Sequence, residues 1–402
     1  MAKNSTITGR LGPAVDRNGL VLVGVGAVLA GFNLRLAIAS LPPLLDDLRR
    51  QPGISAGAAV VLASLPFACF GVVALAAPRF VRFLGAETAL AVVLIGIAIG
   101  TLLRAGGSTA ALLIGTTVAA AAIAVANVIL PVLIRGRFPA RTGLLIGLYT
   151  AALSIGAGLA GAATVPLARW LGWQGALAVW AIPTAFPLVP LILVVRLRSP
   201  VALPRAGRGL HLPLGDRLAW QVTLFFGLQA AIVFSGLSWL PSLLHSEGYS
   251  ASAAGVLLAL YALGGVPASL ATPMLATRVS NQRLLAVGCA AIEAAALAGL
   301  AAVPGGAPGW VGLFALGQGA SFSLAVSLIA LRSSGELQSA DLSGMAQSIG
   351  YVIAAAGPFT VGVLHAAAQD WTVPTIFLIA LCLPMAVAGA GAGRAQRVGA
   401  GG

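Results

Sequence analysis

Residues 31–45 are Gly-Phe-Asn-Leu-Arg-Leu-Ala-Ile-Ala-Ser-Leu-Pro-Pro-Leu-Leu, and they close the first apolar run of the chain. This run is long enough to cross a bilayer, which takes about 20 apolar residues in a helix. Arg35 lies a few residues past its middle. An ionised side chain at that depth costs between about 3 and 15 kcal/mol, so it requires a partner, water or a function.

The composition is that of a polytopic membrane protein. Of the 402 residues, 59% are hydrophobic and 8% are charged, and the mean hydropathy is +1.00. A soluble core cannot use that much apolar surface. The formal net charge of +13 does not indicate nucleic-acid binding, because the basic residues lie in short connections between apolar runs.

Twelve membrane spans can be placed, and the polar N-terminus leads straight into the first without a cleavable signal segment. We place them at residues 19–43, 55–77, 86–103, 109–134, 142–168, 173–195, 218–243, 252–276, 284–303, 309–331, 344–366 and 372–393. Of the 23 basic residues, 18 fall on one side of these spans. Positive charge marks the cytoplasmic side, so we expect a multi-pass protein of the cytoplasmic membrane with both termini in the cytoplasm.

The longest connection divides the chain into two similar halves. We expect an N-terminal six-helix half at 1–195, a cytoplasmic linker rich in Arg, Pro and Gly at 196–217, and a C-terminal six-helix half at 218–402. Residues 53–62 match residues 248–257 at seven of ten positions, and residues 41–45 match 240–244 as Leu-Pro-x-Leu-Leu. Parallel repeats of six helices indicate a transporter whose substrate site lies at mid-membrane between the halves.

Six groups of residues, from the first span to the eleventh, carry a family resemblance. They are Asn33-Leu-Arg35, Leu41-Pro-Pro-Leu-Leu45, Asn127-Val-Ile-Leu-Pro131 with Arg135-Gly-Arg-Phe-Pro139, Gly147-Leu-Tyr-Thr150, Phe225-Phe-Gly-Leu-Gln229 with Trp239-Leu-Pro241, and Gln347-Ser-Ile-Gly-Tyr351. The chain resembles the major facilitator superfamily, and within it the group of cyanate porters and 2-nitroimidazole transporters. The resemblance implies an all-α membrane fold with twelve transmembrane helices in two pseudo-symmetric halves, and transport by alternating access.

Arg35 is the leading candidate for contact with a substrate. A guanidinium stays charged and presents a planar fork that matches a carboxylate-like group. In the alternative interpretation, helix carbonyls or a glutamine of another span satisfy its donors, and its role is structural. The repeat places Phe234 at the position equivalent to Arg35. The cavity would then be charged on one half and aromatic on the other, which suits a small anion with an apolar portion.

Further candidate substrate contacts are uncharged side chains inside the spans, each of which could equally bond a neighbouring helix. They are Gln229, Gln318, Phe226, Tyr149, Asn127 and Tyr351. The resemblance implies that spans 1, 4, 7 and 10 line the cavity, which favours Arg35, Gln229 and Gln318. Glu293 is the only carboxylate well inside a span and is the candidate for proton coupling. The resemblance implies, however, that its span, the ninth, is peripheral.

No pattern of an enzyme or of a cofactor site is visible. The three cysteines and three histidines are scattered, and no Walker-type sequence is present. We expect no cofactor, metal or nucleic-acid partner, and a monomer that contacts the bilayer, a small-molecule substrate and, as a further candidate, protons. The leading function is a secondary carrier for a small anionic or polar organic solute, such as a cyanate- or nitroimidazole-type compound or an organic acid. Its rival is a drug-type exporter in which Phe67, Phe70, Phe226, Phe234 and Trp239 bind the substrate and Arg35 is structural.

Overall fold

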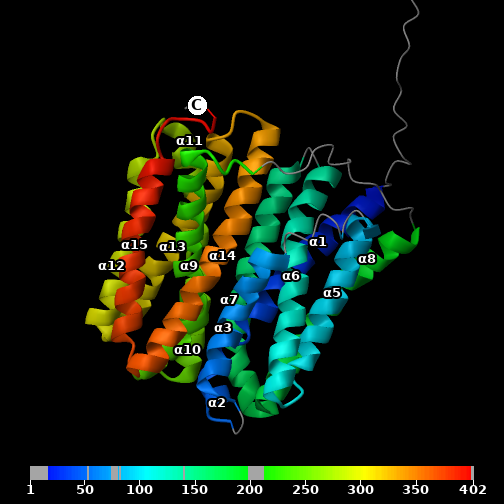
Figure 1. Cartoon of the computed structure of the whole chain (residues 1–402). Coiled ribbons are helices and arrows are strands. Elements are labelled where there is room, and N and C mark those ends of the chain that lie inside the picture. The colour runs from blue at the N-terminus through cyan, green and yellow to red at the C-terminus, as the bar shows by residue number, and fades with distance from the viewer. Residues whose placement is uncertain are drawn as a thin grey trace, which may run out of the picture.

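The computed structural model describes residues 17–51, 54–73, 80, 83–138, 141–197 and 212–399. Its long helices run side by side along one direction (Figure 1). Ten helical segments are long and apolar enough to cross a membrane. One of them, Leu144–Leu193, contains two of the predicted spans, the fifth and the sixth. The shorter apolar helix Gly57–Val73 is the second predicted span and adds one more. Twelve spans are therefore confirmed.

The helices of the two halves follow each other in sequence order. The N-terminal half contains α1 (Arg17–Ala39), η1 (Pro42–Leu44), α2 (Leu45–Arg49), α3 (Ala56–Val73), α5 (Ala86–Leu103), α6 (Thr109–Arg137), α7 (Thr142–Val179), η4 (Ile182–Thr184) and α8 (Ala185–Leu197). The C-terminal half contains α9 (Arg217–Ser246), α10 (Ala251–Gly264), α11 (Val266–Arg278), α12 (Arg283–Ala302), η5 (Pro304–Gly306), α13 (Ala307–Leu331), α14 (Glu336–Ala368) and α15 (Thr372–Ala392).

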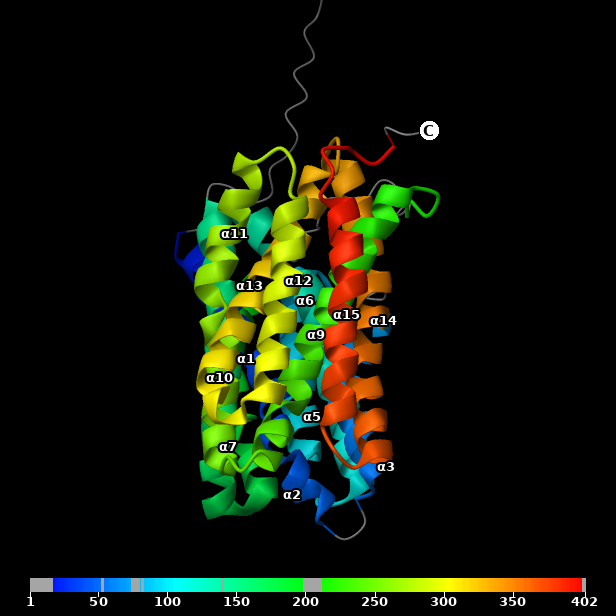
Figure 2. The same ribbon diagram turned by 90° about the vertical axis from the view of Figure 1, so that its left-hand side faces the viewer.

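The bundle has two ends, which we name by their content. The terminal end is where α1 begins and α15 finishes, and the distal end is where α2 lies (Figure 1). Figure 2 shows the C-terminal half from its own side, with α12 and α15 facing the viewer. These two helices cover the C-terminal half on the side away from the N-terminal half.

Three breaks in the helices, one between two spans and two within spans, occur where the sequence weakens the helix. Gly172 adopts a left-handed conformation, with φ of 69°, and separates the fifth span from the sixth close to the predicted boundary. The sixth span is interrupted again by η4, and the eighth is divided into α10 and α11 at Gly265. The sequence predicts the sixth and eighth spans as continuous. Pro183 and Pro267 explain the breaks, because proline lacks the N–H that continues a helix.

The halves meet along α3 with α14 and along α7 with α10. The glycines of α7 allow this approach, since a Cβ added at Gly255 of α10 would lie 2.4 Å from the carbonyl oxygen of Gly161. A Cβ at Gly156 would lie 2.2 Å from the carbonyl oxygen of Phe32. Gly156 and Gly161 therefore allow close packing, and α7 is held tightly against both α1 and the other half.

The distal end is where polar contacts join the two halves. Ser242 Oγ of α9 donates a hydrogen bond of 3.0 Å to Asp46 Oδ1 of α2. One turn earlier, Ser238 Oγ donates one of 2.9 Å to the carbonyl oxygen of Ala63 in α3. Beneath these bonds lies a small cavity between the halves, lined mainly by aliphatic side chains of α1, α3 and α9. The halves are thus in contact at this end.

Candidate functional site

Arg35 lies between the two halves without a protein partner. Its side chain is half-buried, and it forms no hydrogen bond or ion pair with any residue that the structure describes. Its charge is within electrostatic range of the hydroxyl groups of Tyr149, Tyr261 and Tyr351, which belong to α7, α10 and α14. Elements of both halves therefore surround the guanidinium.

Tyr149 packs against α1 one helical turn before Arg35. A Cβ added at Gly31 would lie 2.5 Å from the Tyr149 ring, so only glycine gives the ring this place. The Tyr149 hydroxyl donates a hydrogen bond of 3.3 Å to Asn127 Oδ1 of α6. Two predicted site residues are thereby joined to each other, and one of them lies within electrostatic range of Arg35.

The opposite face of α1 is bonded to the rest of the N-terminal half. Asn33 Nδ2 donates hydrogen bonds to the carbonyl oxygens of Leu29, at 2.9 Å, and of Pro183, at 3.1 Å. Residues two positions apart in a helix point about 200° away from each other. Asn33 therefore turns away from Arg35 and ties α1 to the sixth span.

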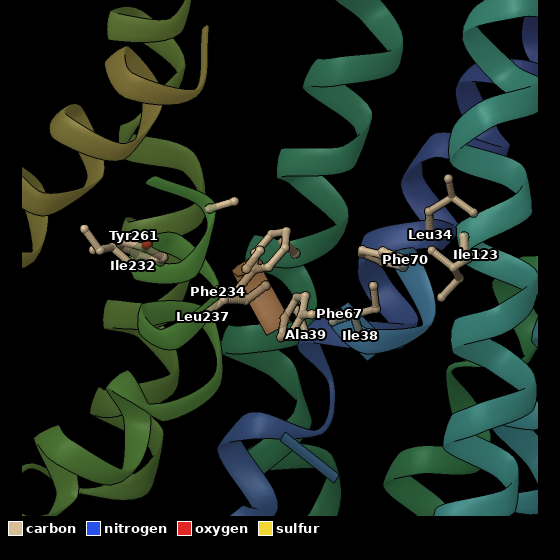
Figure 3. Packing of buried hydrophobic residues seen from close by; sticks show 14 of the residues in the cluster. Leu34, Ile38, Ala39, Phe67, Phe70, Ile123, Ile232, Phe234, Leu237 and Tyr261 are labelled. Atoms are coloured by element: carbon tan, nitrogen blue, oxygen red, sulfur yellow. The ribbon is translucent and has the colours of Figure 1, made fainter. Parts of the chain in front are cut away.

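Aromatic rings of both halves form one cluster on the other side of the site. Phe234 of α9 stacks on Phe67 of α3, with ring centroids 4.0 Å apart, and lies parallel to the Tyr351 ring at 6.2 Å. Phe70 and Phe226 meet Tyr351 edge-on, at 5.9 and 5.4 Å. Figure 3 shows Phe234 and Phe67 in contact at the boundary between the halves. We name Phe67, Phe70, Phe226, Phe234 and Tyr351 the aromatic cluster.

The two predicted glutamines bond helix backbone in this structure. Gln229 is fully buried, and its Nε2 donates a hydrogen bond of 2.9 Å to the carbonyl oxygen of Phe226 in its own helix. Gln318 is half-buried, and its Nε2 donates one of 3.3 Å to the carbonyl oxygen of Tyr261. The Tyr261 carbonyl belongs to the last turn of α10, close to the break at Gly265. A role of either amide in substrate binding stays a prediction.

Glu293 is completely buried inside the C-terminal half. Its Oε1 accepts a hydrogen bond of 2.6 Å from Ser321 Oγ of α13, and its Oε2 has no hydrogen-bond partner. Its helix, α12, packs against α13 and α15, and not along the boundary between the halves. The carboxyl group is therefore beside the site rather than in it, and its part in proton coupling stays a prediction.

Sequence reasoning missed two buried arginine contacts. Arg137 of α6 forms an ion pair with Glu87 of α5, and its Nε donates a hydrogen bond of 2.8 Å to Glu87 Oε1. Arg104, at the end of α5, donates to the carbonyl oxygen of Ala37. In the sequence, Arg104 and Arg137 are most simply signals of topology, with a cytoplasmic gate pair as the alternative for Arg137. Glu87 and Arg137 both lie at the terminal end, but nothing in the sequence singles them out as partners.

The arrangement combines one accessible positive charge with aromatic walls. A guanidinium with free donors binds an anionic or strongly polar group, and aromatic faces bind an apolar or planar portion of the same molecule. Among the residues described, no group of three or more side chains is placed to hold a metal ion. A charge beside aromatic faces is the chemistry of solute binding.

A model of the Major Facilitator Superfamily matches residues 23–358. The chain belongs to this superfamily. As a member of it, the protein is a multi-pass membrane transporter and not an enzyme, and its twelve helices form the two-halved fold of the superfamily.

Named relatives resemble nearly the whole of this superfamily member. The 2-nitroimidazole transporter of Escherichia coli (strain K12) is 37% identical over 95% of this chain and 98% of its own length. The cyanate transport protein CynX of the same strain is 30% identical over 89% of this chain and 94% of its own. A bacterial homologue of the human lysosomal transporter Spinster has the same fold, with a TM-score of 0.74 at 14% identity over 94% of this chain and 97% of its own.

Proposed function

We propose that the protein is a secondary active transporter that moves a small anionic or polar organic solute across the cytoplasmic membrane by alternating access, with Arg35 binding the anionic group. The observation that carries this proposal is the guanidinium of Arg35, which lies between the halves without a protein partner. A buried charge that only stabilised the fold would be expected to have its donors satisfied by the protein. A donor set left open is expected where a ligand completes it.

The surroundings of Arg35 favour a solute with a planar or apolar portion. Tyr149 and Tyr351 bring hydroxyl groups within electrostatic range of the charge, and Phe234 and Phe226 extend the aromatic wall on the other half. The names of the relatives agree with this chemistry, since 2-nitroimidazole is a planar polar ring and cyanate is a small anion. We assign Asn127 the role of orienting Tyr149, to which it is hydrogen-bonded. Gln229 and Gln318 are proposed to line the cavity in other conformations of the transport cycle.

The closed distal end supports an orientation for the transport cycle. Ile38, Phe67 and Leu237 lie together around the small cavity between the halves. Ile38 is three residues past Arg35 in α1, about 4.5 Å nearer the distal end. Because the terminal end carries most of the basic residues, we assign it to the cytoplasm together with both chain termini. Arg35 is then reached from the cytoplasm in this state.

Transport would follow from rocking of the two halves around Arg35. We assign the moving bodies to residues 1–195 and 218–402, joined by the linker 196–217, of which residues 198–211 lie outside the described part of the chain. Opening of the distal end requires the Ser242–Asp46 hydrogen bond and the stacking of Phe234 on Phe67 to break. Glu293 is the candidate group for coupling this motion to protons, and the protein is proposed to work as a monomer.

Uptake and counterflow in proteoliposomes test the proposal. The panel contains small anions, neutral heterocycles including 2-nitroimidazole, and a lipophilic cation, and it compares the wild type with Arg35→Gln and Arg35→Lys. We expect wild-type transport of anions and loss of that transport in Arg35→Gln. Equal transport of an anion by wild type and Arg35→Gln would contradict the proposal.

The aromatic cluster favours a second candidate, a drug-type exporter in which Arg35 is structural. Four of its five proposed binding residues join the cluster, whereas Trp239 pairs with Trp371, with ring centroids 6.0 Å apart, and donates to the carbonyl oxygen of Pro358. Trp239 is therefore outside the proposed aromatic site. Transport of the lipophilic cation that is unchanged in Arg35→Lys and absent in Phe234→Ala would favour this candidate.

A further inference from the structure

Arg104 is a buried arginine that touches the helix carrying Arg35. It follows the last residue of α5, and only 2% of its surface is exposed. Its Nη1 donates a hydrogen bond of 2.8 Å to the carbonyl oxygen of Ala37 in α1. Its Nε and Nη2 are buried without hydrogen-bond partners. Burying a guanidinium with unsatisfied donors is costly, so its presence calls for a compensating role.

The bonded carbonyl lies where α1 ends. The helix stops at Ala39, and Pro42 and Pro43 follow it without N–H groups to offer. The Ala37 carbonyl oxygen accepts hydrogen bonds from Arg104 and, at 3.1 Å, from Ser40 Oγ. A cation at a helix C-terminus is also favoured by the helix dipole. Arg104 thus fixes the last turn of α1.

This contact is one of two that flank Arg35 on the back of its helix. Asn33 lies two residues before Arg35 and is bonded to the carbonyl oxygen of Pro183. Ala37 lies two residues after Arg35 and is bonded to Arg104. Both positions are about 200° around the helix from Arg35, on the face opposite to its side chain. The two bonds therefore resist rotation and sliding of α1 at the level of Arg35.

The neighbouring hairpin is built to admit the Arg104 side chain. A Cβ added at Gly115 of α6 would lie 2.9 Å from Arg104 Cγ and 2.5 Å from its backbone nitrogen. Gly100, one turn before Arg104, approaches α6 equally closely, since its Cβ would lie 2.5 Å from the backbone nitrogen of Ala119. These two glycines place α5 and α6 so close together that the guanidinium is directed onto α1.

We propose that Arg104 is a positioning residue for substrate binding, which holds the end of α1 so that the Arg35 guanidinium keeps its place between the halves. This inference rests on the proposed function of Arg35 as the group that binds the anion. Loss of Arg104 frees the last turn of α1, and Arg35 then meets the substrate in a range of orientations. The effect falls on the affinity for the anion rather than on the rate of the conformational change.

The first experiment measures KM and Vmax for anion uptake in Arg104→Met, which removes the charge and keeps the volume. A buried charge replaced by an apolar side chain of similar size often leaves the fold intact. We expect KM to rise about tenfold, with Vmax changed less than twofold, and Arg104→Lys to restore most of the affinity. Arg104→Gln is measured in the same way if Arg104→Met does not fold.

Arg332 provides a matched control in the other half. It is 4% exposed, and its Nε donates a hydrogen bond of 2.8 Å to the carbonyl oxygen of Ala392, the last residue of α15. Arg332→Met removes the same kind of contact, together with a hydrogen bond from Arg332 to Gln282 Oε1, at the terminal end of the C-terminal half. We expect lower thermal stability and an unchanged KM. Equal rises of KM in Arg104→Met and Arg332→Met would mean that Arg104 only stabilises the fold in general. That result would overturn the proposal.

A second readout does not require transport. In a variant without Cys69, Cys289 and Cys382, a cysteine placed at position 35 is labelled with a charged thiol reagent, with and without Arg104→Met. A cysteine at Gly147, where an added Cβ meets nothing within 4 Å, is the control site. We expect the rate at position 35 to change at least about threefold and the rate at position 147 to stay the same. Unchanged labelling at position 35 would overturn the positioning role.

The two failures are distinguishable. If Arg35→Lys leaves the KM of every anion unchanged, the proposed function of Arg35 fails, whatever Arg104→Met does. The labelling rate at position 35 still reports whether Arg104 holds α1 in place. If instead Arg35→Lys raises KM while Arg104→Met changes neither KM nor labelling, the anion site stands and the positioning role is wrong.

Discussion

Arg35 and Arg137 are both arginines of the N-terminal half, but their guanidinium groups have opposite surroundings. Arg137 is paired with Glu87 at the terminal end of α5 and α6, where the two side chains are 13% and 8% exposed. Arg35 has no partner among the described residues and lies where the halves meet. A charge with a built-in counter-ion holds helices together, and a charge without one is available to a ligand. The same side chain therefore has a structural role at one place and, in the proposed function, a binding role at the other.

Substitution of Arg35 tests this difference most strongly. Loss of one partner from a desolvated charge pair costs about 2 to 5 kcal/mol, which corresponds to about 30-fold or more in the affinity for an anion. We expect Arg35→Gln to lose anion uptake by at least that factor. Its thermal stability in detergent should equal or exceed that of the wild type, because no protein contact is lost. A clear fall in stability would place Arg35 in the same class as Arg137.

Substitution of Glu87 should give the reverse pattern. Breaking a buried ion pair leaves one charge uncompensated, at a cost of 3–5 kcal/mol in full burial, and partial exposure reduces this to about 2 kcal/mol. We expect Glu87→Gln to lower thermal stability while the KM of the folded transporter stays unchanged. The double variant Glu87→Gln/Arg137→Gln should be less destabilised than the sum of the single variants. Additive losses would mean that the two side chains do not interact.

Phe234, the repeat counterpart of Arg35, extends the comparison to the other half. Its stacking on Phe67 crosses between the halves. In the proposed cycle this stacking breaks when the distal end opens. An aromatic pair contributes about 0.5–1.5 kcal/mol beyond its area, so Phe234→Ala should shift the equilibrium toward distal opening by up to about tenfold. The measurement is the labelling rate of a cysteine at position 38, which we expect to rise for a reagent applied from the distal side.

Phe225 offers a matched control for Phe234. It is fully buried, and it packs inside its own half, where a Cβ at Gly389 would lie 2.8 Å from its ring. Phe225→Ala should lower thermal stability and leave the labelling of position 38 unchanged. If both variants raise the labelling equally, the effect comes from general loosening, and the stacking of Phe234 on Phe67 is not part of the closure.

The sequence predicts the positions of the spans well because each span is a continuous run of apolar residues. The third predicted span, 86–103, coincides with α5. The orientation of Asn33 also follows from the sequence, since helix periodicity alone turns it away from Arg35. The break of the eighth span at Gly265 was not predicted, although Pro267 follows it. A single proline inside a span is compatible with a continuous helix as well as with a break.

Contacts between distant residues could not be predicted from one sequence. Glu87 and Arg137 are 50 residues apart, and Arg104 and Ala37 are 67 apart, so no helical period relates them. Their meeting depends on which faces α5 and α6 present to each other and to α1. Gly100 and Gly115 allow α5 and α6 to approach each other closely. From the sequence alone, a glycine in an apolar run does not indicate which helix packs against it.

We expect the smallest effect on anion binding from substitution of Tyr149, which packs on the helix of Arg35 and is bonded to Asn127. Its hydroxyl donates a hydrogen bond of 3.3 Å to Asn127, longer than the usual 2.7–2.8 Å between oxygens. A bond of that length is worth about 0.5 kcal/mol, at the low end of the usual range. Tyr149→Phe should therefore raise KM for the anion only about twofold, and it should not alter thermal stability.

Tyr249→Phe is the control for that small change, because its hydroxyl donates a hydrogen bond of 3.0 Å to the carbonyl oxygen of Pro304 at the distal end of the other half. We expect no change of KM in this variant. A rise of KM well above twofold in Tyr149→Phe would mean that the hydroxyl contacts the substrate directly, beside Arg35. An unchanged KM would show that the ring packed on Gly31, and not the hydroxyl, is what the site takes from Tyr149.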